Sequence, residues 1–152
     1  GIVTSNLDPE RMGRLQVSCA EVLDLNLLAW AMPCVPFAGP NEGFYMLPLP
    51  GSNVWVEFEA GDIERPIWSG CFWTTQTIPL HATNPLVRTI ATATGTVTLD
   101  ATGVTVVLGP SGTPPAMSIS VGPTGVEITN GVNKVAVRVD GVDVNNGALR
   151  VL

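Results

Sequence analysis

The side chains that could perform chemistry in this sequence are few, and a thiol–imidazole pair is the only candidate for nucleophilic catalysis. The base would be His81, the single histidine, and the thiol would come from Cys19, Cys34 or Cys71. His81 lies in an irregular polar stretch, which favours a surface role. An odd number of cysteines without CxxC spacing predicts buried, inert thiols and no disulfide framework. We therefore expect no enzyme; the alternative is a cell-wall hydrolase that uses Cys34 or Glu57.

Four carboxylates, those of Glu57, Glu59, Asp62 and Glu64, form the one acidic cluster of the sequence. Glu57 and Glu59 share one face of a predicted strand, roughly 7 Å apart. The spacing matches no calcium-loop pattern. We therefore expect a solvated hairpin face with no metal ion and no cofactor, in which Asp62 forms a local ion pair with Arg65.

Three tryptophans, Trp55, Trp68 and Trp73, lie on or beside the same predicted hairpin. Aromatic rings on a small β-barrel can stack on bases or sugars, so a module that binds sugar or single-stranded nucleic acid is the alternative function. Nine carboxylates and four arginines precede residue 91, however, and Lys134 is the only lysine. Phosphate binding needs clustered basic side chains. We expect no nucleic-acid partner and rings that pack between subunits or against a hub protein.

The composition suggests a chain that hides part of its surface against a partner. Of its 152 residues, 45% are apolar and 13% are charged, against about 25% charged in ordinary globular domains. No run of about 18 apolar residues predicts a transmembrane helix. No charged-then-apolar leader follows Gly1, so no signal peptide is expected.

The first half reads as short strands separated by Gly and Pro turns, which predicts a small all-β barrel over residues 1–74. Residues 20–32 could form a short helix, but the prolines that follow favour a loop and then a strand. Residues 75–94 are polar and irregular, as expected of a linker or collar. The predicted strands cover residues 1–7, 14–19, 28–32, 44–46, 53–59 and 67–73.

Residues 95–152 alternate between apolar and polar side chains, which predicts seven short strands with one apolar face. Gly, Pro, Asp and Asn mark the turns between them. No helix follows to cover the apolar face, which must find another apolar surface. A small sandwich formed by the chain folding back on itself is one solution, and self-association is the other. The predicted apolar face consists of Val97, Leu99, Val104, Val106, Leu108, Ile119, Val121, Val126, Ile128, Val135, Val137, Val139, Val142 and Val144.

Three segments of the first half resemble one family. Residues 9–17, Pro-Glu-Arg-Met-Gly-Arg-Leu-Gln-Val, resemble the opening strand motif of the oligonucleotide/oligosaccharide-binding-fold (OB-fold) domain of contractile-tail spike proteins. Residues 37–51 resemble that domain's loop with its Pro-Gly turn. Residues 53–70 are most similar: a V-x-V-x-F-E strand, a G-D-x-x-R-P turn, and a returning strand that ends in Gly. In this sequence the residues of the G-D-x-x-R-P turn, which we call the motif turn, are Gly61, Asp62, Arg65 and Pro66.

The family comprises phage baseplate spike proteins, including baseplate assembly protein V, and the valine-glycine-repeat spike of type VI secretion. The resemblance covers residues 9–73 by motif and 95–152 by pattern only. It implies an N-terminal OB-fold barrel followed by a C-terminal triple-stranded, intertwined β-helix in a homotrimer, with the apolar faces turned inward. It also implies a baseplate hub protein at the barrel end and a spike that caps the tail tube and pierces the target cell envelope. The expected location is a virion tail baseplate or a bacterial contractile injection particle that is assembled in the cytoplasm.

The sequence departs from some relatives at two points. It has no room for the lysozyme domain that some carry, and it lacks the His-x-His motif that holds a metal at the apex of others. The sequence instead ends in Ala-Leu-Arg-Val-Leu. We expect Leu149, Val151 and Leu152 of three copies to form an apolar plateau on which a tip protein of the proline-alanine-alanine-arginine-repeat (PAAR) kind docks.

Overall fold

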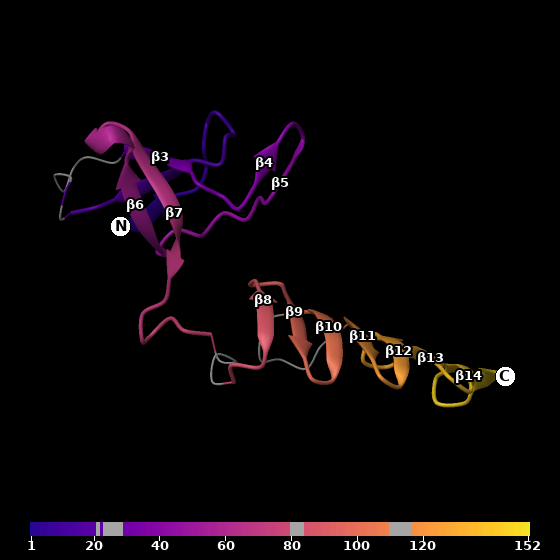
Figure 1. The fold of residues 1–152 in the computed structure, drawn as a ribbon. Helices are drawn as coiled ribbons and strands as arrows, with labels where there is room; N and C mark the ends of the chain where they lie inside the picture. Colours follow the sequence, from indigo (N-terminus) through magenta and orange to yellow (C-terminus); the bar gives the residue numbers. More distant parts are fainter. Residues whose placement is uncertain (21, 23–28, 80–83, 110–116) are drawn as a thin grey trace. The chain divides into compact units, whose positions relative to one another are not determined.

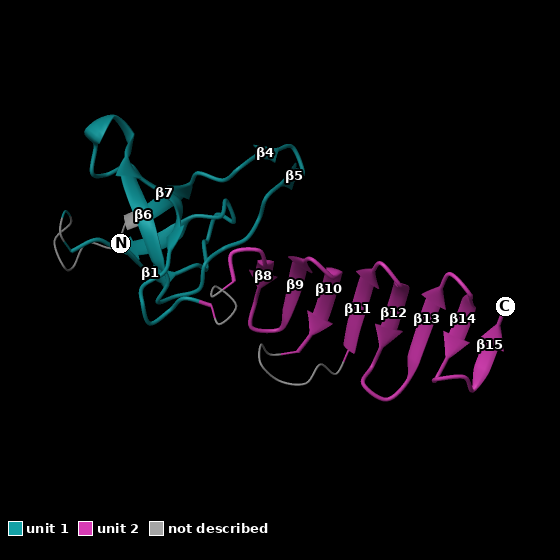
Figure 2. Cartoon of the chain, turned by 60° about the horizontal axis from the view of Figure 1, so that its bottom comes forward, with its two compact units in different colours: residues 1–78 teal, residues 79–152 magenta. Residues whose placement is uncertain are grey.

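A computed structural model of the chain describes residues 1–20, 22, 29–79, 84–109 and 117–152. The chain forms two compact units, residues 1–78 and 79–152 (Figure 2). Within the described residues the only helix is the three-residue 3-10 turn η1 (Glu59–Gly61), so no helix there is long enough to cross a membrane. The all-β prediction is confirmed.

The first unit is a closed five-stranded barrel in the order β1-β2-β3-β7-β6 (Figure 1). Neighbouring strands are antiparallel except β3 and β7, which pair in parallel. The pair Ile2–Asn53 between β1 and β6 closes the barrel, which removes the open strand edges. This confirms an OB-like N-terminal fold. The strands are β1 (Ile2–Ser5), β2 (Leu15–Ser18), β3 (Ala29–Pro33), β6 (Asn53–Phe58) and β7 (Pro66–Phe72).

The barrel encloses a small apolar core made by the inward residues of alternating strands. In β2 the inward side chains are Leu15 and Val17, and in β6 the inward side chain is Val54. Trp68 belongs to this core: it is only 4% exposed, and its Nε1 donates a hydrogen bond of 3.2 Å to the carbonyl oxygen of Gly13. The prediction that Trp68 packs between subunits is therefore wrong. The buried core consists of Val3, Leu15, Val17, Ala31, Val54 and Trp68.

The connection between β3 and β6 differs from the prediction. It carries a small hairpin of β4 (Ala38–Gly39) and β5 (Glu42–Gly43) within the predicted loop, and the predicted strand at 44–46 is absent. The hairpin forms because Asn41 takes a left-handed conformation, with φ 63°, at its turn. The loop expected before β3 falls partly on residues 21 and 23–28, which lie outside the described residues.

The second unit is an eight-stranded antiparallel sheet in which each strand pairs with the next strand in sequence (Figure 2). Its last seven strands match the seven predicted ones. The first, β8, lies inside the range assigned to a linker, because its apolar–polar alternation lasts for only four residues. The strands are β8 (Arg88–Ala91), β9 (Gly95–Asp100), β10 (Gly103–Leu108), β11 (Met117–Gly122), β12 (Gly125–Thr129), β13 (Lys134–Arg138), β14 (Gly141–Val144) and β15 (Leu149–Val151).

Two-residue turns make this sheet a meander within one chain. Residues 101–102, 123–124 and 139–140 connect successive strands, and connections this short produce antiparallel hairpins. Gly125 begins the strand after one such turn with φ 134°, and a Cβ there would lie 2.0 Å from the carbonyl oxygen of Val137. Six of the eight strands have two neighbours in the same chain. These pairs all lie within one chain, and the expected triple-stranded, intertwined β-helix of a homotrimer stays a prediction.

Candidate functional site

The main candidate site is one face of the C-terminal sheet, where register places apolar side chains opposite one another from strand to strand. Directly opposed Cβ atoms in antiparallel strands lie about 4.5–5.5 Å apart, so the rows are continuous apolar surface. The pairs Leu108–Met117 and Leu108–Gly95 form a short third row. The first long row contains Leu99, Val104, Val121, Val126, Val137, Val142 and Val151, and the second contains Ile90, Val97, Val106, Ile119, Ile128, Val135, Val144 and Leu149. We call these residues the apolar rows.

The apolar rows remain open to solvent within this unit. In the two long rows, ten side chains are between 37% and 59% exposed and the other five are half-buried, and Leu108 and Met117 of the third row are also exposed. The only buried apolar side chain among the described residues of the unit, Ala136, lies on the opposite face, between Val135 and Val137. The sheet therefore has six strands paired on both sides but no apolar core of its own among the described residues.

The structure places all but one of the predicted core residues on this face. Val139 is the exception: β13 ends at Arg138, and Val139 lies fully exposed in the two-residue turn before Gly141. Ile90 and Met117 belong to the face but were missed, because each stands beside an irregular stretch that masks the alternation. Leu149 and Val151 of the predicted plateau continue the rows in β15, and Leu152 follows that strand, almost fully exposed.

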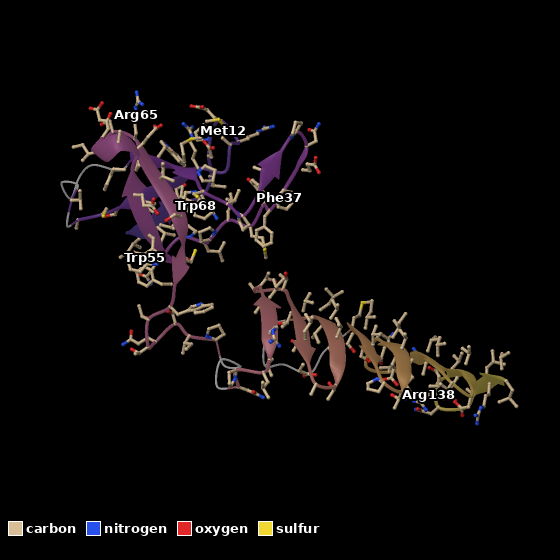
Figure 3. All side chains as sticks on the ribbon, viewed as in Figure 1. Met12, Phe37, Trp55, Arg65, Trp68 and Arg138 are labelled. Carbon is tan, nitrogen blue, oxygen red and sulfur yellow. The ribbon has the colours of Figure 1, made fainter. Side chains whose placement is uncertain are left out.

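The opposite face of the sheet is polar and carries ion pairs. Glu127 lies 3.2 Å from Lys134 and 3.7 Å from Arg138, and Arg150 pairs with Asp140 (Figure 3). The side chains of these pairs are between 25% and 62% exposed, so the pairs contribute little stability. This face is therefore suited to contact with water.

The barrel contains no assembled thiol–imidazole site among its described residues. Cys19 is half-buried, but Cys34 and Cys71 are exposed, so the prediction of buried thiols is wrong for two of the three. The pKa of Cys71 is raised because its thiol is partly withdrawn from water, and a raised pKa lowers thiolate reactivity. His81 lies outside the described residues, and its predicted surface role stays a prediction.

The acidic cluster forms a salt-bridged turn. Arg65 lies 3.6 Å from both Glu59 and Asp62, so the predicted Asp62–Arg65 pair is present. Gly61 has φ 80°, and Pro66 opens β7 after the turn. In the described parts of the chain, no three His, Cys, Asp or Glu side chains come together as metal ligands. The motif turn connects β6 to β7, and we assign it a structural role.

Two exposed aromatic regions of the barrel are candidate partner surfaces. Trp55 is 61% exposed and contacts Phe72 with ring centroids 4.8 Å apart and ring planes tilted by 39°, and Trp73, the residue after Phe72, is also exposed. A separate groove between the 8–13 loop and the β4–β5 hairpin is lined by apolar side chains, and Figure 3 labels two of them, Met12 and Phe37. The groove was missed because its residues come from segments predicted as loops and turns and from the predicted strand 44–46, which is absent. Its main apolar lining is Met12, Val35, Phe37, Phe44, Tyr45 and Leu47.

The Pro9–Val17 motif owes its shape to one carboxylate. Asp8 is 3% exposed at its side chain and accepts hydrogen bonds from the backbone of Glu10, Met12 and Arg14. It also accepts bonds of 3.0 and 2.8 Å from Nε and Nη2 of Arg14. The Arg14 guanidinium and these backbone donors hold the pKa of Asp8 well below its usual range. This clamp fixes the loop that leads into β2.

Comparison with known proteins agrees with this barrel. Residues 1–73, which span every barrel strand, match the family described as the Type VI secretion system/phage-baseplate injector OB domain. No curated protein matches the chain. The family is one of structural baseplate proteins, which implies a role other than catalysis. Residues 1–73 of this chain belong to the Type VI secretion system/phage-baseplate injector OB domain family.

Proposed function

We propose that this protein is the homotrimeric central spike of a contractile injection apparatus, with the C-terminal sheets of three copies forming a needle. One observation carries the proposal: the apolar rows run across all eight strands, and no described residue of their own unit covers them. A chain with only 13% charged residues agrees with surface hidden in an assembly.

Threefold closure covers the apolar face of every copy with the same surface, and it is the arrangement that the resemblance to contractile-tail spike proteins implies. Three sheets standing as the walls of a triangular prism turn all their apolar rows inward and their ion-paired faces outward. Burying one Val, Leu or Ile side chain contributes roughly 1.5–3 kcal/mol, so the rows contribute tens of kcal/mol per chain before the cost of ordering. The open edges of β8 and β15 would then lie at the two ends of the prism.

The work of such a needle is mechanical. Eight strands spaced about 4.8 Å apart give a length of about 34 Å. Bending it would break many backbone hydrogen bonds together, so it can transmit the force of sheath contraction to the target cell envelope. The protein would act without a cofactor, a metal ion, nucleic acid or enzymatic activity.

The ends of the spike would have different protein partners. The barrel would attach to a baseplate hub protein and so cap the tail tube, with exposed Trp55 and Trp73 available for contact. The other end would carry a tip protein of the PAAR kind on Leu149, Val151 and Leu152. The assembled spike would lie in a virion tail baseplate or a related bacterial injection particle.

The mass of the full chain in solution tests this proposal. Light scattering should give about three times 15.9 kDa at micromolar concentration. A well-folded chain that stays a single subunit, with both units melting cooperatively, would contradict it.

The tip contact can be tested separately. Leu152→Asp should abolish recruitment of a PAAR-type protein while the trimer mass is unchanged, because Leu152 follows the last strand. The control is Val132→Asp, which places a charge on an equally exposed residue in the loop before β13. Unchanged recruitment by Leu152→Asp would rule out the plateau as the docking site.

A further inference from the structure

The first strand of the C-terminal sheet places one charge on the apolar face. Arg88 pairs with Leu99, and Ile90 pairs with Val97, so Arg88 continues the first long row. Among the described residues of these strands, Arg88 is the only charged residue at a position of the apolar face. The others occupy the polar face or its margin: Asp100, Glu127, Lys134, Arg138, Asp143 and Arg150.

Arg88 has no acidic partner in the described part of the chain. Its guanidinium makes one polar contact there, a bond of 3.4 Å from Nη1 to the carbonyl oxygen of Leu86, and no described carboxylate lies within ion-pair distance. The nearest acid across the β8–β9 hairpin, Asp100, belongs to the polar-face register and accepts hydrogen bonds from Thr102. Most of the five donors of the Arg88 guanidinium are therefore unused.

Assembly changes the surroundings of this charge. In the proposed trimer, on which this inference rests, the apolar rows of three copies face one axis, and three Arg88 side chains meet at its first layer. Three like charges beside an apolar core repel one another and lose hydration, which is costly unless an anion compensates them. No described residue of the unit can supply that anion from the same face.

We propose that three Arg88 side chains bind one tetrahedral oxyanion, such as phosphate or sulfate, on the threefold axis at the first strand of the needle. A tetrahedral oxyanion placed with one bond along the axis presents three equivalent oxygens. Each oxygen can accept charge-assisted hydrogen bonds from one planar guanidinium. The site is incomplete in a single chain, because each copy contributes one third of its donors.

Sulfate is a suitable probe because its charge does not change near neutral pH. The full chain is measured in sulfate and in chloride at equal ionic strength. Titration calorimetry should give one sulfate per three chains, and the melting midpoint of the trimer should rise by at least about 2 °C at 10 mM sulfate. Arg88→Gln should lose both signals. Arg138→Gln, which removes an arginine from the opposite face, should keep both.

Each outcome separates this site from the trimer on which it depends. A trimeric mass with no sulfate-specific shift would overturn the anion site and leave the trimer standing, because the guanidinium groups then extend out to water. An equal shift in wild type and Arg88→Gln would also overturn it, as binding of an adventitious ion only. A monomeric mass would overturn the proposed function and the site with it. If Arg88→Gln fails to fold, Arg88→Lys keeps the charge but loses the bidentate geometry, and it should weaken sulfate binding about tenfold.

Discussion

The barrel and the C-terminal sheet are both β-structures of similar length in which each strand pairs with its neighbours, but only the barrel has an interior. Five strands close on themselves and bury Leu15, Val54 and Trp68 among others. The eight strands of the sheet leave two open edges, at β8 and β15, and bury a single alanine among the described residues. Strand pairing satisfies the backbone, whereas closure shelters the side chains. We propose that other copies supply the shelter that the sheet lacks.

A charge placed on the apolar rows should separate the two units most strongly. Ile119→Asp in β11 would bury three unpaired carboxylates at one layer of the trimer, each at a cost of several kcal/mol. We expect the mass by light scattering to fall to one third, while the barrel keeps its near-ultraviolet circular dichroism. The neighbouring Ser120→Asp points to the polar face and should leave the mass unchanged.

If both variants stay trimeric, the apolar rows are not the contact between copies. If both become monomeric, the face to which a residue belongs does not matter, and the comparison between the two faces of the sheet fails.

Truncation inside the barrel should destabilise a unit that needs no partner. Leu15→Ala removes a fully buried side chain and should lower the free energy of unfolding by about 2–5 kcal/mol. Urea unfolding followed by the fluorescence of buried Trp68 measures the loss. The loss should not depend on protein concentration. Leu7→Ala, at an exposed position, should change the value by less than about 0.5 kcal/mol. A midpoint that shifts with concentration would show that the barrel also relies on association.

Glycine replacement compares the turns of the two units. Gly125→Ala combines φ 134° with a Cβ position 2.0 Å from a backbone oxygen, and we expect it to cost about 2–3 kcal/mol. Gly61→Ala in the barrel has φ 80° but open space around the Cβ, and it should cost about 1 kcal/mol. Thermal unfolding of each variant measures the difference. Equal losses would mean that the tight approach of strands at the two-residue turn is easily relaxed.

The Asp8 clamp predicts a smaller, pH-dependent effect that is confined to the barrel. The folded-state pKa of Asp8 lies below its unfolded value of about 3.9. Its contribution is therefore complete above that value and is lost as pH falls below it. Asp8→Asn should lower the barrel's melting midpoint at pH 7, and the difference from wild type should narrow below about pH 4. Melting curves from pH 7 to pH 2 measure this, and a difference that stays constant would exclude the ionised clamp.

The alternation of residues 95–152 was enough to predict seven strands and their apolar face, because period-two patterning needs no tertiary information. The alternation of apolar and polar residues could not predict the position of Val139. Strand β13 ends at Arg138, so Val139 lies in the following turn and not on the apolar face. Tertiary packing decided the role of Trp68: its ring fills the barrel and its Nε1 reaches Gly13, 55 positions away in sequence. The exposure of Cys34 likewise follows from its position beyond the end of β3, which composition does not reveal.

The two-residue turns along one margin of the sheet make its length adjustable in fixed increments. One added hairpin returns the chain to the same margin with the same orientation of its side chains, and it extends the sheet by about 9.6 Å. Removing one shortens the sheet by the same amount without disturbing the register of the remaining strands. The length of this sheet can therefore change in evolution by one hairpin at a time, without any change in residues 1–78.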